Sequence, residues 1–308
     1  MTQLISLGDL IGKGFKAIQD TWRPTLKYTI WFLLAPSLWY GLMFGSLLGS
    51  FIASTPDGGG MGSVGPVLTV FWIVSFIAML VGLFYAWVCL MQYMLAYSKG
   101  ENMANWKPRN PLSYLPGALW LYVLMCVPMV VAMLVVVLPA IVVRDQNISG
   151  LLVALLMLAA TVFIIWLSTA FSQAHLLLLT DEARGIAALK GSLALVNGRW
   201  WATFWRLVVP MLVFYILAST IMSAVFMLIF MLGFVFLGGW AAIMGTVGSA
   251  EAAQGANIGF GLGGIVFIVL SIVIALGLSL VQAVTQTVFQ ADVISRLFWS
   301  LKHTKQTK

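Results

Sequence analysis

The chain has 308 residues, of which 62% are hydrophobic and only 8% are charged, and its formal net charge is +7. Soluble domains carry about 25% charged residues. A soluble fold of this size cannot hide so much apolar surface, so the composition predicts a protein that lies largely in lipid. Backbone polar groups in lipid must be satisfied internally, which restricts spanning segments to helices or a closed barrel. The apolar runs here are long and continuous, not alternating, and therefore favour helices.

The sequence predicts one all-α membrane domain over residues 1–308, with six transmembrane helices and two interfacial amphipathic helices. Within residues 1–27, Ser6 is the expected N-cap, with Asp9 completing a capping box. An amphipathic helix should follow to about Trp22, and Pro24 then breaks or restarts it. The predicted spans are approximately residues 28–52, 67–97, 117–143, 151–179, 206–237 and 258–293. Residues 181–205 contain the second interfacial helix, expected over 186–200, and residues 294–308 form a tail.

Glycine, proline and polar residues mark the connections between the spans. We expect a Gly/Pro loop at Ser54–Pro66, an irregular proline-rich linker at 98–116, a tight turn at Arg144–Gly150 and a Gly/Ala loop at Gly238–Asn257.

The positive charges predict the orientation in the membrane. Fifteen of the 16 lysines and arginines fall in residues 1–27, 98–116, 180–206 and the tail, and the opposite side has only Arg144. Cytoplasmic segments carry such an excess. We therefore expect a multi-pass protein of the cell (inner or plasma) membrane with both termini in the cytoplasm. The charge is interpreted as attraction to anionic headgroups of the bilayer, and not as a nucleic-acid interface.

Two basic amphipathic segments are related by an offset of 178 residues. The offset pairs Ile11, Phe15, Ile18, Trp22, Thr25 and Leu26 with Leu189, Leu193, Val196, Trp200, Thr203 and Phe204. Both segments lead into an outward-going span, so a repeat would be parallel, unlike the inverted repeats of many transporters. Chance similarity is the alternative. The two helices would lie on the inner leaflet, either as simple anchors or as a collar for a cytoplasmic partner.

Residues His175–Trp205 read HLLLLTDEARGIAALKGSLALVNGRWWATFW. An apolar helix end is followed by an acidic turn with glycine, then by the pattern ALxxSxxLVxGRWW and the next span. This stretch resembles a broad family of uncharacterised bacterial six-span membrane proteins related to the membrane domain of glycerophosphodiester phosphodiesterases; Lys190–Gly191–Ser192 departs slightly from the more usual basic-basic-Ser. The resemblance implies the six-span layout and no catalytic residues, because the phosphodiesterase domain is a separate soluble barrel without a counterpart here.

The sequence offers little for catalysis. Ionisable residues inside a membrane usually mark functional sites, and no two carboxylates share a predicted span. The chain has neither an HExxH nor a GxSxG motif. We therefore expect no enzymatic activity, no cofactor and no metal site.

The candidate site is a polar face in the cytoplasmic half of spans 2, 4 and 6. Its residues are Gln92, Gln173, His175, Gln282, Gln286 and Gln290. The spacing of four between the last three glutamines places them on one helix face. They would line a groove for a headgroup or a small polar substrate, or would only hydrogen-bond between helices. His175 by itself is more typical of a packing histidine.

Glycines spaced by four residues allow close helix approach. Gly41, Gly45 and Gly49 show this spacing, which indicates either contact within the bundle or self-association.

Two functions remain open. The first is a non-enzymatic membrane organiser or scaffold, and the second is a transporter of a small or lipid-like substrate along the polar face. A water-accessible cavity between spans 2, 4 and 6 would favour transport, whereas a dry, fully packed core would exclude it.

Overall fold

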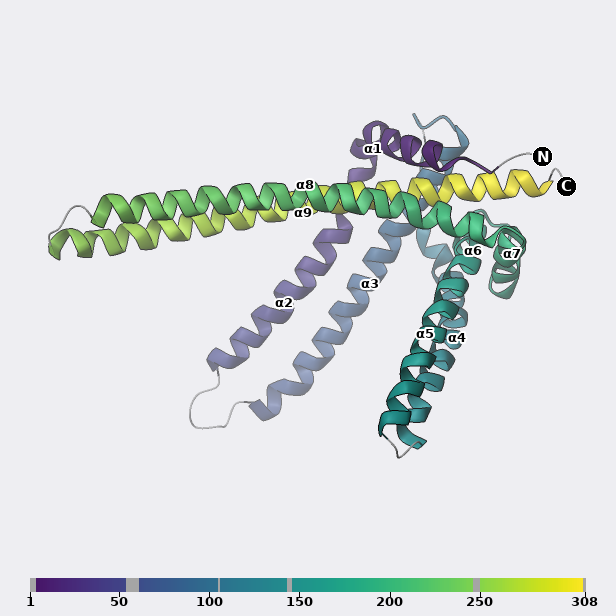
Figure 1. Cartoon of the computed structure of the whole chain (residues 1–308), viewed down its shortest axis with the longest axis horizontal. Helices are drawn as coiled ribbons and strands as arrows, with labels where there is room; N and C mark the ends of the chain where they lie inside the picture. The colour runs from purple at the N-terminus through teal and green to yellow at the C-terminus, as the bar shows by residue number, and fades with distance from the viewer. Residues whose placement is uncertain (1–3, 54–60, 105, 143–145, 246–249, 307–308) are drawn as a thin grey trace. The chain divides into compact units, whose positions relative to one another are not determined.

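The computed structural model describes residues 4–53, 61–104, 106–142, 146–245 and 250–306. These described residues form helices and contain no strand, which confirms the all-α class (Figure 1). The elements are α1 (Leu7–Thr29), α2 (Trp31–Ala53), α3 (Met61–Lys99), η1 (Pro111–Tyr114), α4 (Leu115–Val142), α5 (Gln146–Phe171), α6 (Ala174–Leu179), α7 (Ile186–Val196), α8 (Trp200–Gly245) and α9 (Ala250–Gln306).

The chain divides into two compact units. The first unit comprises Met1–Pro210 and Val288–Lys308, and the second comprises Met211–Thr287. The second unit thus consists of the C-terminal part of α8 and the N-terminal part of α9. All the sites described below lie in the first unit.

Among the described residues, four stretches are long and apolar enough to cross a membrane. They are Val70–Lys99, Pro111–Val137, Gly150–Leu179 and Trp200–Gly233. Large apolar side chains such as Phe71, Leu134 and Leu158 are exposed along them, as expected of surfaces that face lipid. The chain therefore has the character of a membrane protein. Predicted spans 28–52 and 258–293 fall on α2 and α9, whose side chains are only partly described, and the six-span layout stays a prediction.

The N-terminal helix begins as expected but ends later. The Ser6 hydroxyl accepts a hydrogen bond from the Asp9 backbone N–H at 3.0 Å. The predicted break at Pro24 is wrong, because α1 continues through this residue to Thr29 and the chain turns at Ile30. Hydroxyls of Ser and Thr help such a helix to tolerate proline by bonding nearby carbonyls. The Thr25 hydroxyl does so here, donating to the Thr21 carbonyl at 2.7 Å.

Three predicted loops are too long. Helix α3 already begins at Met61, α5 at Gln146 and α9 at Ala250, while α8 continues to Gly245. Residues 54–60, 143–145 and 246–249 lie outside the described residues. Glycine costs a helix only about 1 kcal/mol relative to alanine, and alanine favours helix strongly. A Gly/Ala stretch next to an apolar run therefore extends the helix instead of ending it.

The predicted tail, residues 294–308, is helical as far as Gln306 and belongs to the core of the first unit. Leu297, Phe298 and Leu301 are fully buried there. Their spacing along the chain places them on one face of α9. The basic residues on either side of them, Arg296 and Lys302, favoured the interpretation as a solvated tail.

Helix α1 packs against protein through small residues. Its most buried positions include Leu10, Gly14 and Ala17, whereas Trp22, which was expected on the apolar face, is 45% exposed. A Cβ built on Gly14 would lie 2.6 Å from the ring of the fully buried Phe289 in α9. The predicted interfacial helix is therefore also part of the protein core.

Equivalent positions are buried in α1 and in the second basic segment, residues 181–205. The pairs Leu10 and Ala188, Gly14 and Ser192, and Thr25 and Thr203 are buried in both copies at the offset of 178 residues. The copies differ in one respect. The helix expected over 186–200 ends at Val196, and Gly198 has a φ of +75° in the turn before α8. A left-handed residue of this kind ends a helix at little cost only when it is glycine.

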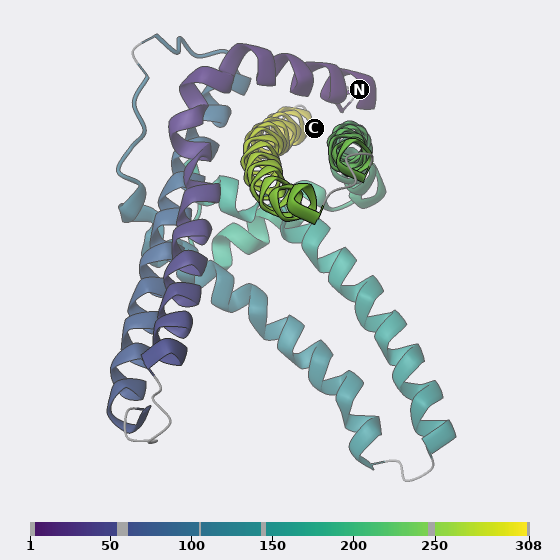
Figure 2. The same cartoon turned by 90° about the vertical axis from the view of Figure 1, so that its left-hand side faces the viewer.

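The core of the first unit forms where the ends of several helices meet. Leu90 and Met94 of α3, Leu176 of α6 and Phe298 of α9 are completely buried in it. Helices α2 and α3 run side by side, as do α4 and α5 (Figure 2). The glycine contact expected within the bundle is not formed at Gly41 or Gly45, because no described atom lies within 4 Å of a Cβ built at either position. Gly49 lies outside the described side chains.

Candidate functional site

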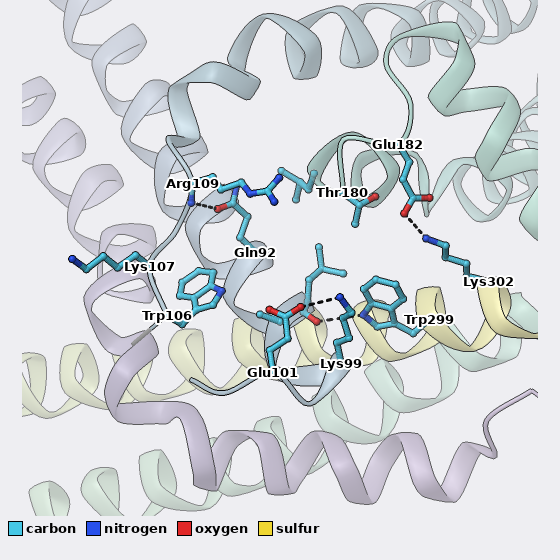
Figure 3. A pocket seen from close by; sticks show the side chains of 13 residues that line it. Gln92, Lys99, Glu101, Trp106, Lys107, Arg109, Thr180, Glu182, Trp299 and Lys302 are labelled. Atoms are coloured by element: carbon cyan, nitrogen blue, oxygen red, sulfur yellow. Dashed lines mark hydrogen bonds and ion pairs between the residues drawn. The ribbon is translucent and has the colours of Figure 1, made fainter. Parts of the chain in front are cut away.

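A pocket with a volume of about 420 Å³, called the basic pocket below, lies in the first unit next to the core (Figure 3). The described residues that line it combine cationic side chains, carboxylates and two indoles. They are Gln92, Leu95, Ala96, Lys99, Glu101, Trp106, Lys107, Arg109, Leu179, Thr180, Glu182, Trp299 and Lys302. The last turns of α3, the linker that follows it, the end of α6 and the last turns of α9 supply them.

The end of α3 places Lys99 and Glu101 together. Gly100 has a φ of +82°, its N–H donates to the Tyr97 carbonyl at 3.0 Å, and the Glu101 N–H donates to the Ala96 carbonyl at 3.1 Å. This is the Schellman arrangement, which satisfies the last carbonyls of a helix and needs glycine at the left-handed position. The chain reverses there, and the Glu101 carboxylate returns to the Lys99 ammonium at 3.0 Å.

Two lysine–glutamate ion pairs lie on the wall of the pocket. One joins Lys99 to Glu101, and the other joins Lys302 of α9 to Glu182 in the turn after α6. All four side chains keep contact with solvent. Ion pairs of this kind contribute only about 0–1 kcal/mol each. Both lysines can therefore exchange their carboxylate partners at low cost.

Both of these lysines lie near the same indole. The Lys99 and Lys302 ammonium nitrogens are 5.7 and 5.3 Å from the centroid of the Trp299 ring. The indole N–H donates to the Leu95 carbonyl at 3.3 Å, which fixes the plane of the ring. Cations at such distances are attracted to the π face of the ring. Trp299 thus holds two positive charges at one end of the pocket.

Gln92 contributes a buried amide to the same wall. Its side chain is only 8% exposed, and its Oε1 accepts from the Arg109 backbone N–H at 3.0 Å. That donor requires an oxygen, so the amide orientation is determined. The Nε2 group then has no hydrogen-bond partner within the described residues. A buried donor left unsatisfied costs about 1–3 kcal/mol.

Asp181 joins the two sides of the pocket entrance. It occupies a left-handed conformation with a φ of +56° and accepts from Arg109 Nη1 at 2.7 Å and from the Tyr114 hydroxyl at 3.2 Å. Arg184 lies 3.8 Å away. The hydrogen bond that the Arg109 guanidinium donates to the Tyr114 oxygen and the charge of Asp181 raise the pKa of Arg109, which stays charged. These contacts hold the linker against the turn after α6.

An apolar pocket of about 470 Å³ lies further toward the N-terminus along α3. Phe84 and Trp87 of α3 line it together with Phe32 of α2 and Tyr122 of α4. Its size and apolar lining suit a hydrocarbon chain.

The residues of the predicted polar face lie in several different environments. Gln92 lines the basic pocket, whereas His175 packs its ring against Trp87 with a centroid distance of 5.2 Å. Gln290 is half-buried in the first unit and does not line the basic pocket. Gln282 and Gln286 belong to the second unit. A shared groove of these side chains stays a prediction.

Gln173 lies at a break in a predicted span. Residues 172–173 separate α5 from α6, so the helix expected over 151–179 is interrupted. The buried Ser192 hydroxyl of α7 donates to the Ala170 carbonyl at 2.7 Å and accepts from the Gln173 N–H at 3.2 Å. The serine of the GSLALV segment thus replaces helix hydrogen bonds lost at the break. The Gln173 Oε1 has no partner among the described residues.

Several of the pocket residues were not singled out from the sequence. Tryptophans such as Trp106 and Trp299 near charged segments are typical of membrane-interface anchors, and Lys302 was counted only among the positive charges of the tail. The spacing of three between Trp299 and Lys302 would have placed both on one face of a helical tail. Glu182 carried no pattern that could identify it.

A search of the described residues finds no group of three or more His, Cys, Asp or Glu side chains suited to a metal. The fully buried Asp292 pairs with Arg296 on the next turn of α9, with Oδ2 and Nε 2.7 Å apart.

No family model, curated protein or solved structure matches this chain. The family resemblance of His175–Trp205 therefore stays a prediction.

Proposed function

We propose that this chain is a non-enzymatic membrane protein that organises anionic lipid by binding headgroups at the cytoplasmic face. The observation that carries the proposal is the basic pocket, whose lining includes the four cations Lys99, Lys107, Arg109 and Lys302 and the buried amide of Gln92. Each lysine or arginine near the surface of an anionic membrane contributes about 1 kcal/mol of attraction. The pocket concentrates this attraction in one place.

The surface of α1 also supports a location at the headgroup layer of the membrane. Lys13, Lys16, Arg23 and Lys27 are exposed on the side away from its buried stripe, and Trp22 is exposed beside them. Tryptophan and basic residues together favour the headgroup layer. The bias of lysine and arginine along the chain supports a cytoplasmic location for this layer, with both termini on that side.

The apolar pocket favours a lipid over other anions. It lies along α3, the helix that also contributes Leu95 and Lys99 to the basic pocket. An amphiphile needs both a polar and an apolar contact, and this helix offers them in succession. The six-span family resemblance agrees with a membrane-embedded role and adds no activity.

The test is lipid retention by the full chain. We expect native mass spectrometry of protein from mixed-lipid nanodiscs to show retained anionic lipid in preference to phosphatidylcholine. Replacing the four pocket cations Lys99, Lys107, Arg109 and Lys302 with glutamine should abolish this preference. The matched control replaces four cations outside the pocket, Lys13, Lys16, Arg23 and Lys27. It removes the diffuse attraction of α1 but leaves the pocket intact, and it should therefore keep clearly more of the preference than the pocket variant does. Equal retention by the two quadruple variants would contradict the proposal.

Transport is the second candidate, supported by the break at residues 172–173. Interrupted helices with unpaired polar groups form the substrate sites of many transporters, and the buried Gln173 Oε1 lacks a partner within the described residues. Proteoliposomes should then move a labelled lipid between leaflets, and Gln173→Leu should stop this movement. Protein-independent movement, or full activity of Gln173→Leu, would exclude this candidate.

A further inference from the structure

We propose that the basic pocket binds a phosphate ester, whose oxygens replace Glu101 and Glu182 as the partners of Lys99 and Lys302. This inference rests on the proposed function, since it names the chemical class of ligand for the same pocket.

The two lysines form a prepared pair. Their ammonium groups lie 5.7 and 5.3 Å from the centroid of one indole, Trp299, which is fixed by its bond to the Leu95 carbonyl. They come from α3 and α9, and Figure 3 shows both side chains extending beside this ring. In the proposed complex one anion takes the place of both carboxylates.

The carboxylates hold these lysines in the free state. Glu101 lies two residues from Lys99 in the same turn, and Glu182 reaches Lys302 from the loop after α6. Exposed pairs contribute little free energy, so a stronger anion displaces them readily. Exchange releases both glutamates to water, where their charges are solvated.

The remaining groups exclude a cationic ligand. The two glutamates that line the pocket are already paired with lysines, and the Trp299 ring is already near two ammonium groups. The Gln92 amide is uncharged, and its Nε2 donor without a partner among the described residues offers nothing to a cation. The pocket is therefore built for a ligand rich in acceptor oxygens.

Phosphate fits this set better than a carboxylate does. A carboxylate has two oxygens and one charge, whereas a phosphate monoester has three strong acceptor oxygens and a charge of about −1.5 to −2 at neutral pH. Its oxygens can accept from Lys99 and Lys302 in place of Glu101 and Glu182. Charge-assisted bonds of this type are about twice as strong as neutral ones.

The phosphate can belong to a lipid headgroup or to a soluble ester, and the experiment separates these sources. The full chain in phosphatidylcholine nanodiscs is titrated with methyl phosphate in one arm. In the other arm, phosphatidic acid is introduced into the nanodiscs and bound lipid is counted by native mass spectrometry. Binding in either arm supports the shared chemistry, and the arm that binds more tightly identifies the source.

Three variants test the residues, and each is checked for an unchanged elution profile and thermal midpoint. Lys99→Gln/Lys302→Gln should weaken phosphate binding by at least about tenfold, as expected for the loss of charge-assisted hydrogen bonds. Gln92→Glu keeps the oxygen that accepts from Arg109 but replaces the donor with an anionic oxygen, and it should weaken binding similarly. Glu101→Gln/Glu182→Gln removes the competing anions and should tighten binding.

The control variant, Lys190→Gln/Lys305→Gln, removes the same charge from exposed positions outside the pocket and should bind normally. The inference is overturned if neither phosphate probe binds, if the lysine variant binds like the control, or if the glutamate variant binds more weakly. Anionic lipid retained by a lysine variant that has lost phosphate specificity would leave the proposed function intact. Absence of any anionic-lipid preference, with methyl phosphate still bound, would reject the proposed function alone.

Discussion

Gly14 offers a sharp test of the packing between α1 and α9. Replacing it with alanine adds a Cβ that would lie 2.6 Å from Phe289 Cε2 and 2.9 Å from Cδ2, well inside van der Waals contact. Phe289 is fully buried, so its ring cannot rotate away freely. Overpacking of this kind costs about 1–3 kcal/mol. Gly12 lies on the same helix with no described atom within 4 Å of a Cβ.

The comparison of Gly14→Ala with Gly12→Ala isolates this cost. Each substitution gains about 0.8–1 kcal/mol of helix propensity, so the difference between the two reports the contact with Phe289 alone. We expect Gly12→Ala to raise the thermal midpoint of the detergent-solubilised protein. The free energy of unfolding of Gly14→Ala should be about 1–3 kcal/mol lower than that of Gly12→Ala. Unfolding is followed by differential scanning fluorimetry and by loss of the monodisperse elution peak. A Gly14→Ala variant as stable as Gly12→Ala would refute the packing of α1 against α9.

Three further outcomes follow from the structure. Ser192→Ala should destabilise the protein by about 2–4 kcal/mol in the same assay, because the Ala170 carbonyl and the Gln173 N–H both lose a buried partner; Ser192→Thr, which keeps the hydroxyl, should retain part of the stability. Asp292→Ala should cost about 3–5 kcal/mol, since it leaves the Arg296 charge largely buried without its carboxylate, and the double variant with Arg296→Met should recover much of this loss. Protease-cleavable tags on both termini should be cut only when the protease has access to the cytoplasmic side, and cleavage of one tag from the opposite side would contradict the predicted topology.

Local sequence properties determined the helical character of the chain. Long apolar runs without alternation satisfy their backbone in lipid as helices, and the Ser6 cap follows from side-chain chemistry over one turn. Helix ends were predicted less well where glycine and proline suggested loops. Pro24 and the Gly238–Gly245 segment remain helical, because local propensities of about 1–3 kcal/mol are outweighed by the backbone hydrogen bonds of the surrounding helix.

The candidate site could be predicted only in part. Gln92 was selected from the sequence as a polar residue in an apolar span, and it does line the pocket. The partners that give it meaning lie elsewhere in the chain: Arg109 follows in the linker, and Trp299 and Lys302 lie more than 200 residues away. No periodicity connects such positions, since their distance in space depends on how the helix ends converge.

The sequence by itself was enough to predict that the chain lies in lipid, that it is helical, and which side of the membrane its basic segments should face. Composition and charge allow this because they act through local interactions with lipid and water. Only the tertiary structure decided that the basic C-terminal segment is a buried helix and not a tail, and that Lys302 meets Glu182 and Trp299. Contacts between distant segments depend on three-dimensional packing, in which Gly14 must accommodate Phe289 and Ser192 must reach the break after Ala170. The sequence shows which residues are present, but it does not show which distant residues come into contact.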